Sequence, residues 1–220
     1  MAVSSSLNGK PSPWQISLGA VGMASSQFAR CGFDVSVLSG PNKPWYDLLV
    51  ARGENLLKVV VKGSEDGAWG LIESYLKRAS DMSGKKADYQ GAIDLWLDHH
   101  GTRTAICLVQ FEGVSVQQLP RIYLASPDEL APFLRESVDR LASPILHEKY
   151  VWGSVADGAA AVETLPSAWL FAESRVQELL QDRLAKAQPA RVLPRKYRTA
   201  AIWPASAVVP RISYAKEAAA

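Results

Sequence analysis

The sequence predicts an α/β protein in which helices cover a mixed β-sheet. Two observations lead to this fold class. The hydrophobic patterns follow the order helix, three strands, helix, and then further strands and helices, which is typical of layered α/β domains. The chain has 220 residues, of which 48% are hydrophobic and 21% are charged. It is therefore long enough and apolar enough to bury a core of its own.

The first predicted elements are one helix and three strands. Apolar residues recur at helical spacing through residues 14–30, and Gly32 follows as a helix stop. Residues 33–38 alternate with a period of two, and residues 46–50 predict a second strand. Residues 56–61 are rich in apolar and β-branched side chains, so we expect a third strand buried on both faces.

The middle of the chain continues this alternation of helices and strands. Residues 68–79 fit a helix with one apolar face. The apolar residues within 92–98 alternate, which predicts a strand, and residues 104–111 and 121–124 predict two more.

A capping box marks the start of the next helix. Ser126 is an N-cap, Pro127 suits the first helical position and Glu129 completes the box, so we expect a helix to about residue 141. Residues 142–166 carry no clear pattern, and Ser167 is expected to cap a last helix that ends near residue 187.

These patterns divide the chain into four parts. They are a flexible arm over 1–13, an α/β core over 14–141, a helical addition over 142–190 and an extended basic tail over 191–220.

Charge is concentrated in the tail. Residues 181–220 hold eight Lys/Arg and two Asp/Glu, whereas the first 180 residues hold sixteen and twenty. A body of mild negative charge is not a broad platform for nucleic acid, but the tail has that character. Its basic residues, mixed with Tyr197, are candidates for clamping a phosphate backbone, and a solvated charged tail is the alternative. They are Arg191, Arg195, Lys196 and Arg198.

The sequence also bears on location. No apolar run approaches the ~18 residues that span a bilayer, so we expect no membrane insertion. The N-terminus lacks the basic and then apolar layout of a signal peptide, which predicts a cytoplasmic protein.

Several segments, taken in order, resemble the PD-(D/E)XK nuclease superfamily, and most closely its small Holliday-junction-resolvase-like endonucleases. They are SLGAVGMASSQFARCGFDVSVL, YDLLV at 46–50, the strand that ends in Lys62, AIDLWLDHHGTRTAICLVQF and RIYLASPDEL. The resemblance covers residues 14–140. It implies a restriction-endonuclease-like layered fold, with a central mixed sheet flanked by helices and the helical C-terminal addition beside it.

The same resemblance implies a Mg²⁺-dependent site for cutting DNA. Asp47 takes the place of the metal-binding and catalytic acid, and Lys62 that of the catalytic lysine. In such a site the metal polarises the phosphate and lowers the pKa of a water, while the lysine stabilises developing negative charge.

Two positions depart from the family pattern. Val60 stands where an acid or amide is expected two residues before Lys62, and Met23 follows Gly22 where the first helix carries a glutamate. Both changes remove metal-supporting carboxylates. Glu73, on the following predicted helix, is the candidate for a migrated second ligand.

Structural roles are the alternatives for these residues. Asp47 can cap the start of a strand, and Lys62 can end a buried strand with its ammonium in water. His99 and His100 are expected in an exposed turn rather than at a metal. Trp45 and Trp69 flank the predicted site and could stack on bases, although core and interface roles are commoner for tryptophan.

Three functions follow from the sequence. The first is a nuclease-like protein with a degenerate active site that acts as a nucleic-acid-associated or protein-interaction module. The second is an active Mg²⁺-dependent DNA endonuclease that uses Asp47, Lys62 and a migrated carboxylate. The third is a structural partner protein or homo-oligomer.

Overall fold

The computed structural model describes residues 10–40, 44–84, 86–101, 103–152 and 161–185. The candidate basic residues of the tail, from Arg191 to Arg198, lie outside these ranges. None of the described helices is long and apolar enough to cross a bilayer.

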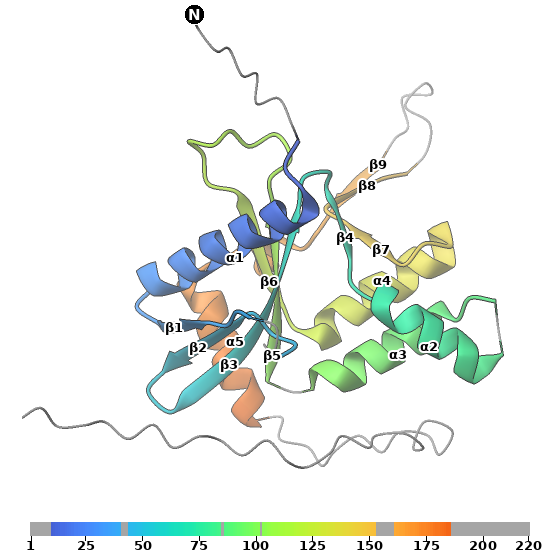
Figure 1. Cartoon of the computed structure of the whole chain (residues 1–220), viewed down its shortest axis with the longest axis horizontal. Helices are drawn as coiled ribbons and strands as arrows, with labels where there is room; N and C mark the ends of the chain where they lie inside the picture. The colour runs from blue at the N-terminus through green and yellow to red at the C-terminus, as the bar shows by residue number, and fades with distance from the viewer. Residues whose placement is uncertain (1–9, 41–43, 85, 102, 153–160, 186–220) are drawn as a thin grey trace, which may run out of the picture. The chain divides into compact units, whose positions relative to one another are not determined.

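A five-stranded sheet forms the centre of the described chain, in the order β1-β2-β3-β5-β6 (Figure 1). Its strands are β1 Asp34–Val37, β2 Leu48–Arg52, β3 Asn55–Ser64, β5 Thr104–Gln110 and β6 Arg121–Ala125. The first three run antiparallel to one another, β5 runs parallel to β3, and β6 returns antiparallel to β5. The sheet is therefore mixed, and the predicted α/β class is confirmed.

Helices cover both faces of this sheet. Figure 1 shows α1 and α5 on one face, and α2, α3 and α4 on the other. Their bounds are α1 Pro13–Arg30, α2 Glu73–Ser83, α3 Tyr89–His100, α4 Pro127–Leu141 and α5 Glu173–Ala185. The parallel pairing of β3 and β5 requires a crossover connection, and α2 and α3 supply it.

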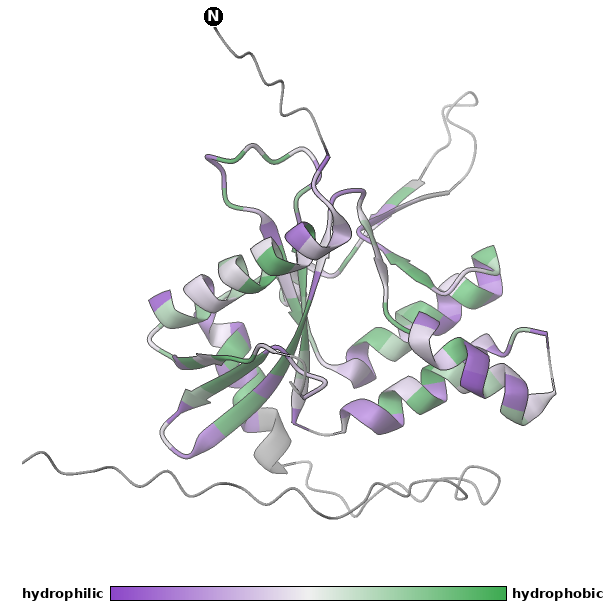
Figure 2. Cartoon of the chain, in the orientation of Figure 1, coloured by the Kyte–Doolittle hydropathy of each residue, from purple (hydrophilic) through white to green (hydrophobic). Residues whose placement is uncertain are grey.

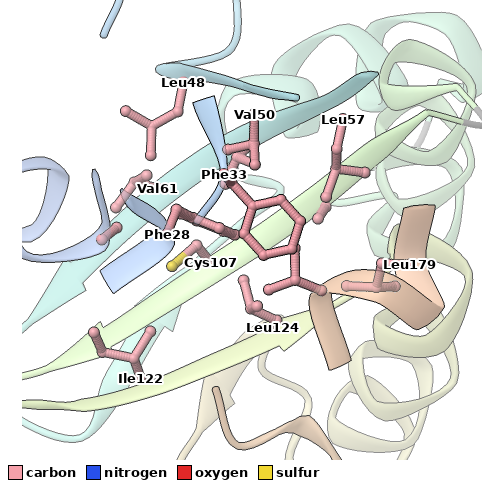
Figure 3. Close-up of a cluster of buried hydrophobic side chains, with 14 of the residues drawn as sticks. Phe28, Phe33, Leu48, Val50, Leu57, Val61, Cys107, Ile122, Leu124 and Leu179 are labelled. Carbon is pink, nitrogen blue, oxygen red and sulfur yellow. The ribbon is translucent and has the colours of Figure 1, made fainter. Parts of the chain in front are cut away.

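A hydrophobic cluster fills the space between the sheet and the helices α1 and α5 (Figure 3). The rings of Phe28 and Phe171 meet edge to face, with centroids 5.1 Å apart. Figure 2 shows hydrophobic residues concentrated along the strands and polar residues on the outer side of α2. Since Val176, Leu179 and Leu180 of α5 belong to this cluster, the last helix is part of the main core.

The first helix begins where local chemistry predicts. Ser12 and Gln15 form a capping box, and Pro13 occupies the first turn. Ala20, Ala24 and Phe28 are its buried face. A Cβ at Gly63 of β3 would lie 2.9 Å from the Ala20 Cβ, so a residue without a side chain lets α1 cross the sheet closely.

Two predicted elements are wrong. Residues 92–98, predicted as a strand, lie within α3, whose N-cap Asp88 accepts a hydrogen bond from the Gly91 amide. Buried residues at 92, 96 and 100 show the helical spacing that the alternation within 92–98 obscured. The predicted helix over 68–79 begins with a short strand, β4 Ala68–Gly70, and turns helical only at Glu73.

The last third holds strands as well as a helix. Residues 142–166, assigned from sequence to a helical addition, contain β7 Ile145–His147, β8 Lys149–Trp152 and β9 Ala161–Thr164. β7 pairs with β4, and β8 pairs with β9. Ser167 opens a short 3₁₀ helix, η2 Ser167–Trp169, and the predicted last helix begins only at Glu173, as α5.

The capping box predicted for α4 is present. The Ser126 hydroxyl accepts from the Glu129 amide, and the Glu129 carboxylate accepts from the Ser126 amide. Arg175 of α5, which is buried, donates to the same carboxylate at 2.6 Å and to the Leu124 carbonyl at 3.1 Å. Arg175 therefore joins α5 to α4 through an ion pair and to the end of β6 through a hydrogen bond.

Candidate functional site

Asp47 and Lys62 line one hollow at the edge of the sheet, as their positions on adjacent strands predict. Leu57, Val59 and Val61 of β3 face the core under α1, so Val60 and Lys62 face the other way. Asp47 precedes β2 and is oriented like them, because its neighbour Leu48 faces the core. The hollow has a volume of about 360 Å³, and its walls are Ser17, Trp45, Asp47, Val60, Val61, Lys62 and Gly63.

The carboxylate of Asp47 is engaged by the sheet. Its Oδ2 accepts a hydrogen bond from the Val61 amide at 2.8 Å. The Asp47 amide donates to the Val59 carbonyl, and its carbonyl accepts from the Leu38 amide. Asp47 thus links the start of β2 to the middle of β3 and to the residue after β1, which is a structural role of the kind the sequence left open.

Within the described residues, the hollow supplies one of the carboxylates that the predicted Mg²⁺ site needs. Of the described residues that line the hollow, only Asp47 carries a carboxylate. Val60 lies in the wall itself, and Met23 packs partly buried against the core under α1. No group of three or more His, Cys, Asp or Glu side chains that could hold a metal occurs within the described ranges.

Glu73 does not supply the missing carboxylate to this hollow. It opens α2, and its carboxylate lies over the backbone of Gly70, where a Cβ would meet it. It is exposed and is not among the lining residues. Asp66 lies in the loop between β3 and β4, and its carboxylate accepts a hydrogen bond from the Ser64 hydroxyl at 2.9 Å.

An inner cavity of about 170 Å³ adjoins the hollow and shares Trp45, Val60 and Lys62 with it. Its other walls come from β4, α2, α3 and β5 and their flanking residues: Leu71, Ser74, Tyr75, Trp96, His99, His100 and Ile106. The cavity is thus lined by several aromatic rings, and Lys62 stands between it and the outer hollow.

The rings of this region are in mutual contact. The Trp45 centroid lies 5.2 Å from that of His99 and 5.0 Å from that of His100. Trp96 meets His100 at 5.1 Å, and Tyr75 meets His99 at 5.7 Å. Such edge-to-face contacts hold aromatic side chains in fixed positions.

A second lysine borders the aromatic group. The Nζ of Lys58 lies 5.5 Å from the Trp45 ring centroid and 5.4 Å from that of Tyr46. Lys58 and Lys62 project from the same face of β3, roughly 13 Å apart along the strand. Trp45 is therefore near two amines, that of Lys58 over its ring and that of Lys62 in the same lining.

His100 is buried, contrary to the exposed turn expected for both histidines. It ends α3 with 7% of its surface exposed, whereas His99 is exposed. Burial, together with the nearby His99 and Lys62, lowers the pKa of His100 to about 3, so the ring is neutral at neutral pH. Among the described residues its Nδ1 has no hydrogen-bond partner.

Trp69 does not belong to the site, although the sequence placed it beside Trp45 as a candidate for base stacking. It lies in β4 with 2% of its surface exposed and contacts Tyr123 edge to face. It is a buried residue of the small sheet that β4 forms with β7.

The chain was compared with known proteins at three levels. Protein-family models, curated proteins and solved structures gave no match. The function is therefore inferred from the geometry of the site.

Proposed function

We propose that this protein binds nucleic acid at the edge of its sheet, on a restriction-endonuclease-like fold whose metal site is degenerate. The observation that carries the proposal is the hollow itself. It joins Asp47, Lys62 and an aromatic side chain in one wall, but holds a single carboxylate.

The fold agrees with this kinship. The described chain begins with α1 and the antiparallel strands β1, β2 and β3, and a helical crossover then leads to β5 parallel to β3. Up to β3 this is the order of one helix and three strands that the sequence predicted, whereas residues 92–98, which the sequence assigned to a strand, lie in α3. Asp47 and Lys62 lie at the ends of neighbouring strands, as a nuclease-like site requires.

The loss of carboxylates argues for binding over hydrolysis. Mg²⁺ in phosphoryl chemistry is held by one or two carboxylates that also orient it, with waters and phosphate oxygens in the remaining positions. Here Asp47 already accepts from the Val61 amide, and Val60 offers no ligand atom. Lys62 in the wall of the hollow and Lys58 beside Trp45 carry amines of the kind that hold a phosphate backbone.

The aromatic side chains favour a single strand over a duplex. Base stacking on aromatic rings requires unpaired bases, and Trp45 lies near both lysines. A channel of amines and rings is the usual construction of sites that bind single strands without sequence preference.

Fluorescence anisotropy with an end-labelled single strand tests this function. Affinity should fall steeply between about 50 mM and about 200 mM salt, because phosphate contacts release counterions. Lys62→Gln should weaken binding about five- to tenfold and lower the salt slope by about one. Lys149→Gln, the same change at an exposed lysine of β8, should leave both unchanged.

A cleavage assay separates the two nuclease-like functions. In it the same end-labelled single strand is incubated with the protein and Mg²⁺, and the products are resolved by length. Intact strand with salt-dependent binding supports the proposal. Cleavage that disappears in Lys62→Gln supports the active endonuclease instead. A protein that neither binds nor cuts, and that runs as an oligomer, would point to the structural partner.

A further inference from the structure

We propose that the inner cavity receives one nucleobase, whose attached phosphate is held at Lys62 in the outer hollow. This inference rests on the proposed function and adds the chemical class of the ligand group. The single strand and the free mononucleotide share this chemistry. Four features of the cavity argue for it.

The first feature is size. The outer hollow, at about 360 Å³, is as large as common ligand sites, which measure ~300–1,000 Å³. The inner cavity, at about 170 Å³, is smaller than that range. It therefore suits one flat ring system, while the rest of the ligand stays in the outer hollow.

The second feature is the lining. Trp45, Tyr75 and Trp96 all border the cavity, and Val60 and Ile106 of the sheet form its apolar floor. Flat heterocycles gain from stacking against such rings, at roughly 1–3 kcal/mol per base in nucleic-acid complexes.

The third feature is charge. Aromatic groups of this kind also bind quaternary ammonium ions. Here Lys62 lines the cavity and Lys58 lies over the Trp45 ring, so two ammonium groups would repel a cationic ligand. A neutral ring that carries an anionic group fits both the rings and the amines.

The fourth feature is His100. Its Nδ1 is buried and, within the described residues, has no hydrogen-bond partner, which is rare for a buried polar atom. A neutral imidazole forms one hydrogen bond at each nitrogen, as donor or acceptor. Every nucleobase carries both N–H donors and acceptors, so a base in the cavity can form a hydrogen bond with the His100 ring where that ring lines it.

Lys62 connects the two spaces. It lines both the inner cavity and the outer hollow, whereas His100 lines only the inner one and Asp47 only the outer one. A base against His100 therefore has its own phosphate within the region of the Lys62 amine. The site therefore recognises a single base and not a series of bases.

The test compares two labelled strands of ~10 nucleotides, one with bases and one with abasic sugars only, by anisotropy without divalent metal. The wild type should bind the strand with bases roughly tenfold more tightly than the abasic strand. Trp45→Ala should remove most of this difference and leave the abasic affinity unchanged. Lys62→Gln should weaken both strands by the same factor.

Two further variants guard the interpretation. His100→Phe keeps a ring of similar size, and it should weaken binding of the strand with bases while leaving the affinity for the abasic strand unchanged. Tyr89→Ala, at the opposite end of α3, should behave as the wild type. If Trp45→Ala does not fold, Tyr75→Leu on α2 tests the same stacking.

The outcomes distinguish the inference from the proposed function. Equal affinity of the wild type for both strands overturns the base cavity and leaves strand binding intact. Free mononucleotides that quench tryptophan fluorescence, and lose this effect in Trp45→Ala, support the cavity even if no strand binds. Failure of strands and of all mononucleotides to bind overturns both.

Discussion

Replacing Glu148 with alanine is expected to lower the free energy of unfolding by about 2–3 kcal/mol, because the buried Tyr123 hydroxyl and the Arg121 guanidinium lose their acceptor. Glu148 has 2% of its surface exposed. It accepts from Arg121 through Nε at 2.6 Å and Nη2 at 2.8 Å, and from the Tyr123 hydroxyl at 2.7 Å. Its loss leaves these donors of β6 without their acceptor.

The charge of Glu148 is secured by these partners. Burial opposes ionisation, but the hydrogen bonds from Arg121 and Tyr123 outweigh it and keep the pKa of Glu148 below its usual value. Urea denaturation gives the measurement. Glu136→Ala is the matched control, because Glu136 pairs with Arg140 on the exposed face of α4 and should cost about 0.5 kcal/mol or less. Equal losses in the two variants would refute the buried network.

Acidification from about pH 7 to about pH 5 is expected to destabilise the protein by about 2 kcal/mol through His100. The pKa of His100 falls from 6.5 to about 3 on folding, because the ring is buried beside His99 and Lys62. Between these values the unfolded chain binds a proton that the folded chain does not. Stability is therefore complete above about pH 6.5 and declines as the pH falls toward about 3.

The variant His100→Phe isolates this contribution. It should remain more nearly constant in stability over the same pH range, and the difference from the wild type is the effect of His100. Burial also lowers the pKa of His99, which leaves a smaller slope of the same sign. His147→Phe, a histidine outside the cavity, should keep the full wild-type dependence. A wild-type slope in His100→Phe would contradict the assignment.

The sequence was sufficient for the parts of the fold that local chemistry determines. Period-two patterns and turn residues predicted the three antiparallel strands, and Ser126 with Glu129 predicted the start of α4. It was insufficient for α3. This helix lies under α4 and beside the sheet, so Ile93, Leu95 and Trp96 are all buried. The exposed residues Gln90, Asp94 and Asp98 do follow helical spacing, but within 92–98 the apolar residues also fit a period of two, and so short a segment is compatible with both patterns.

The residues of the candidate site likewise divide into those that could be predicted from the sequence and those that could not. The family resemblance implied one site for Asp47 and Lys62, and the structure brings them into one hollow. The inner cavity could not be predicted, because His99 and His100 reach it only when residues 89–100 are helical. The position of Glu73 also depended on β4, a short strand that the sequence did not reveal. The one signal for the inner cavity in the sequence was His100, a histidine close to an apolar segment.

The most direct test of the central claim is a proton–nitrogen NMR spectrum of the tryptophan indole groups, recorded with and without a single-stranded oligonucleotide. The seven tryptophans report on separate regions of the chain. Trp45 and Trp96 line the cavity, whereas Trp169 packs against Phe133 of α4 away from it. We expect the signals of Trp45 and Trp96 to shift and that of Trp169 to stay. Binding that leaves Trp45 and Trp96 unshifted would contradict the site.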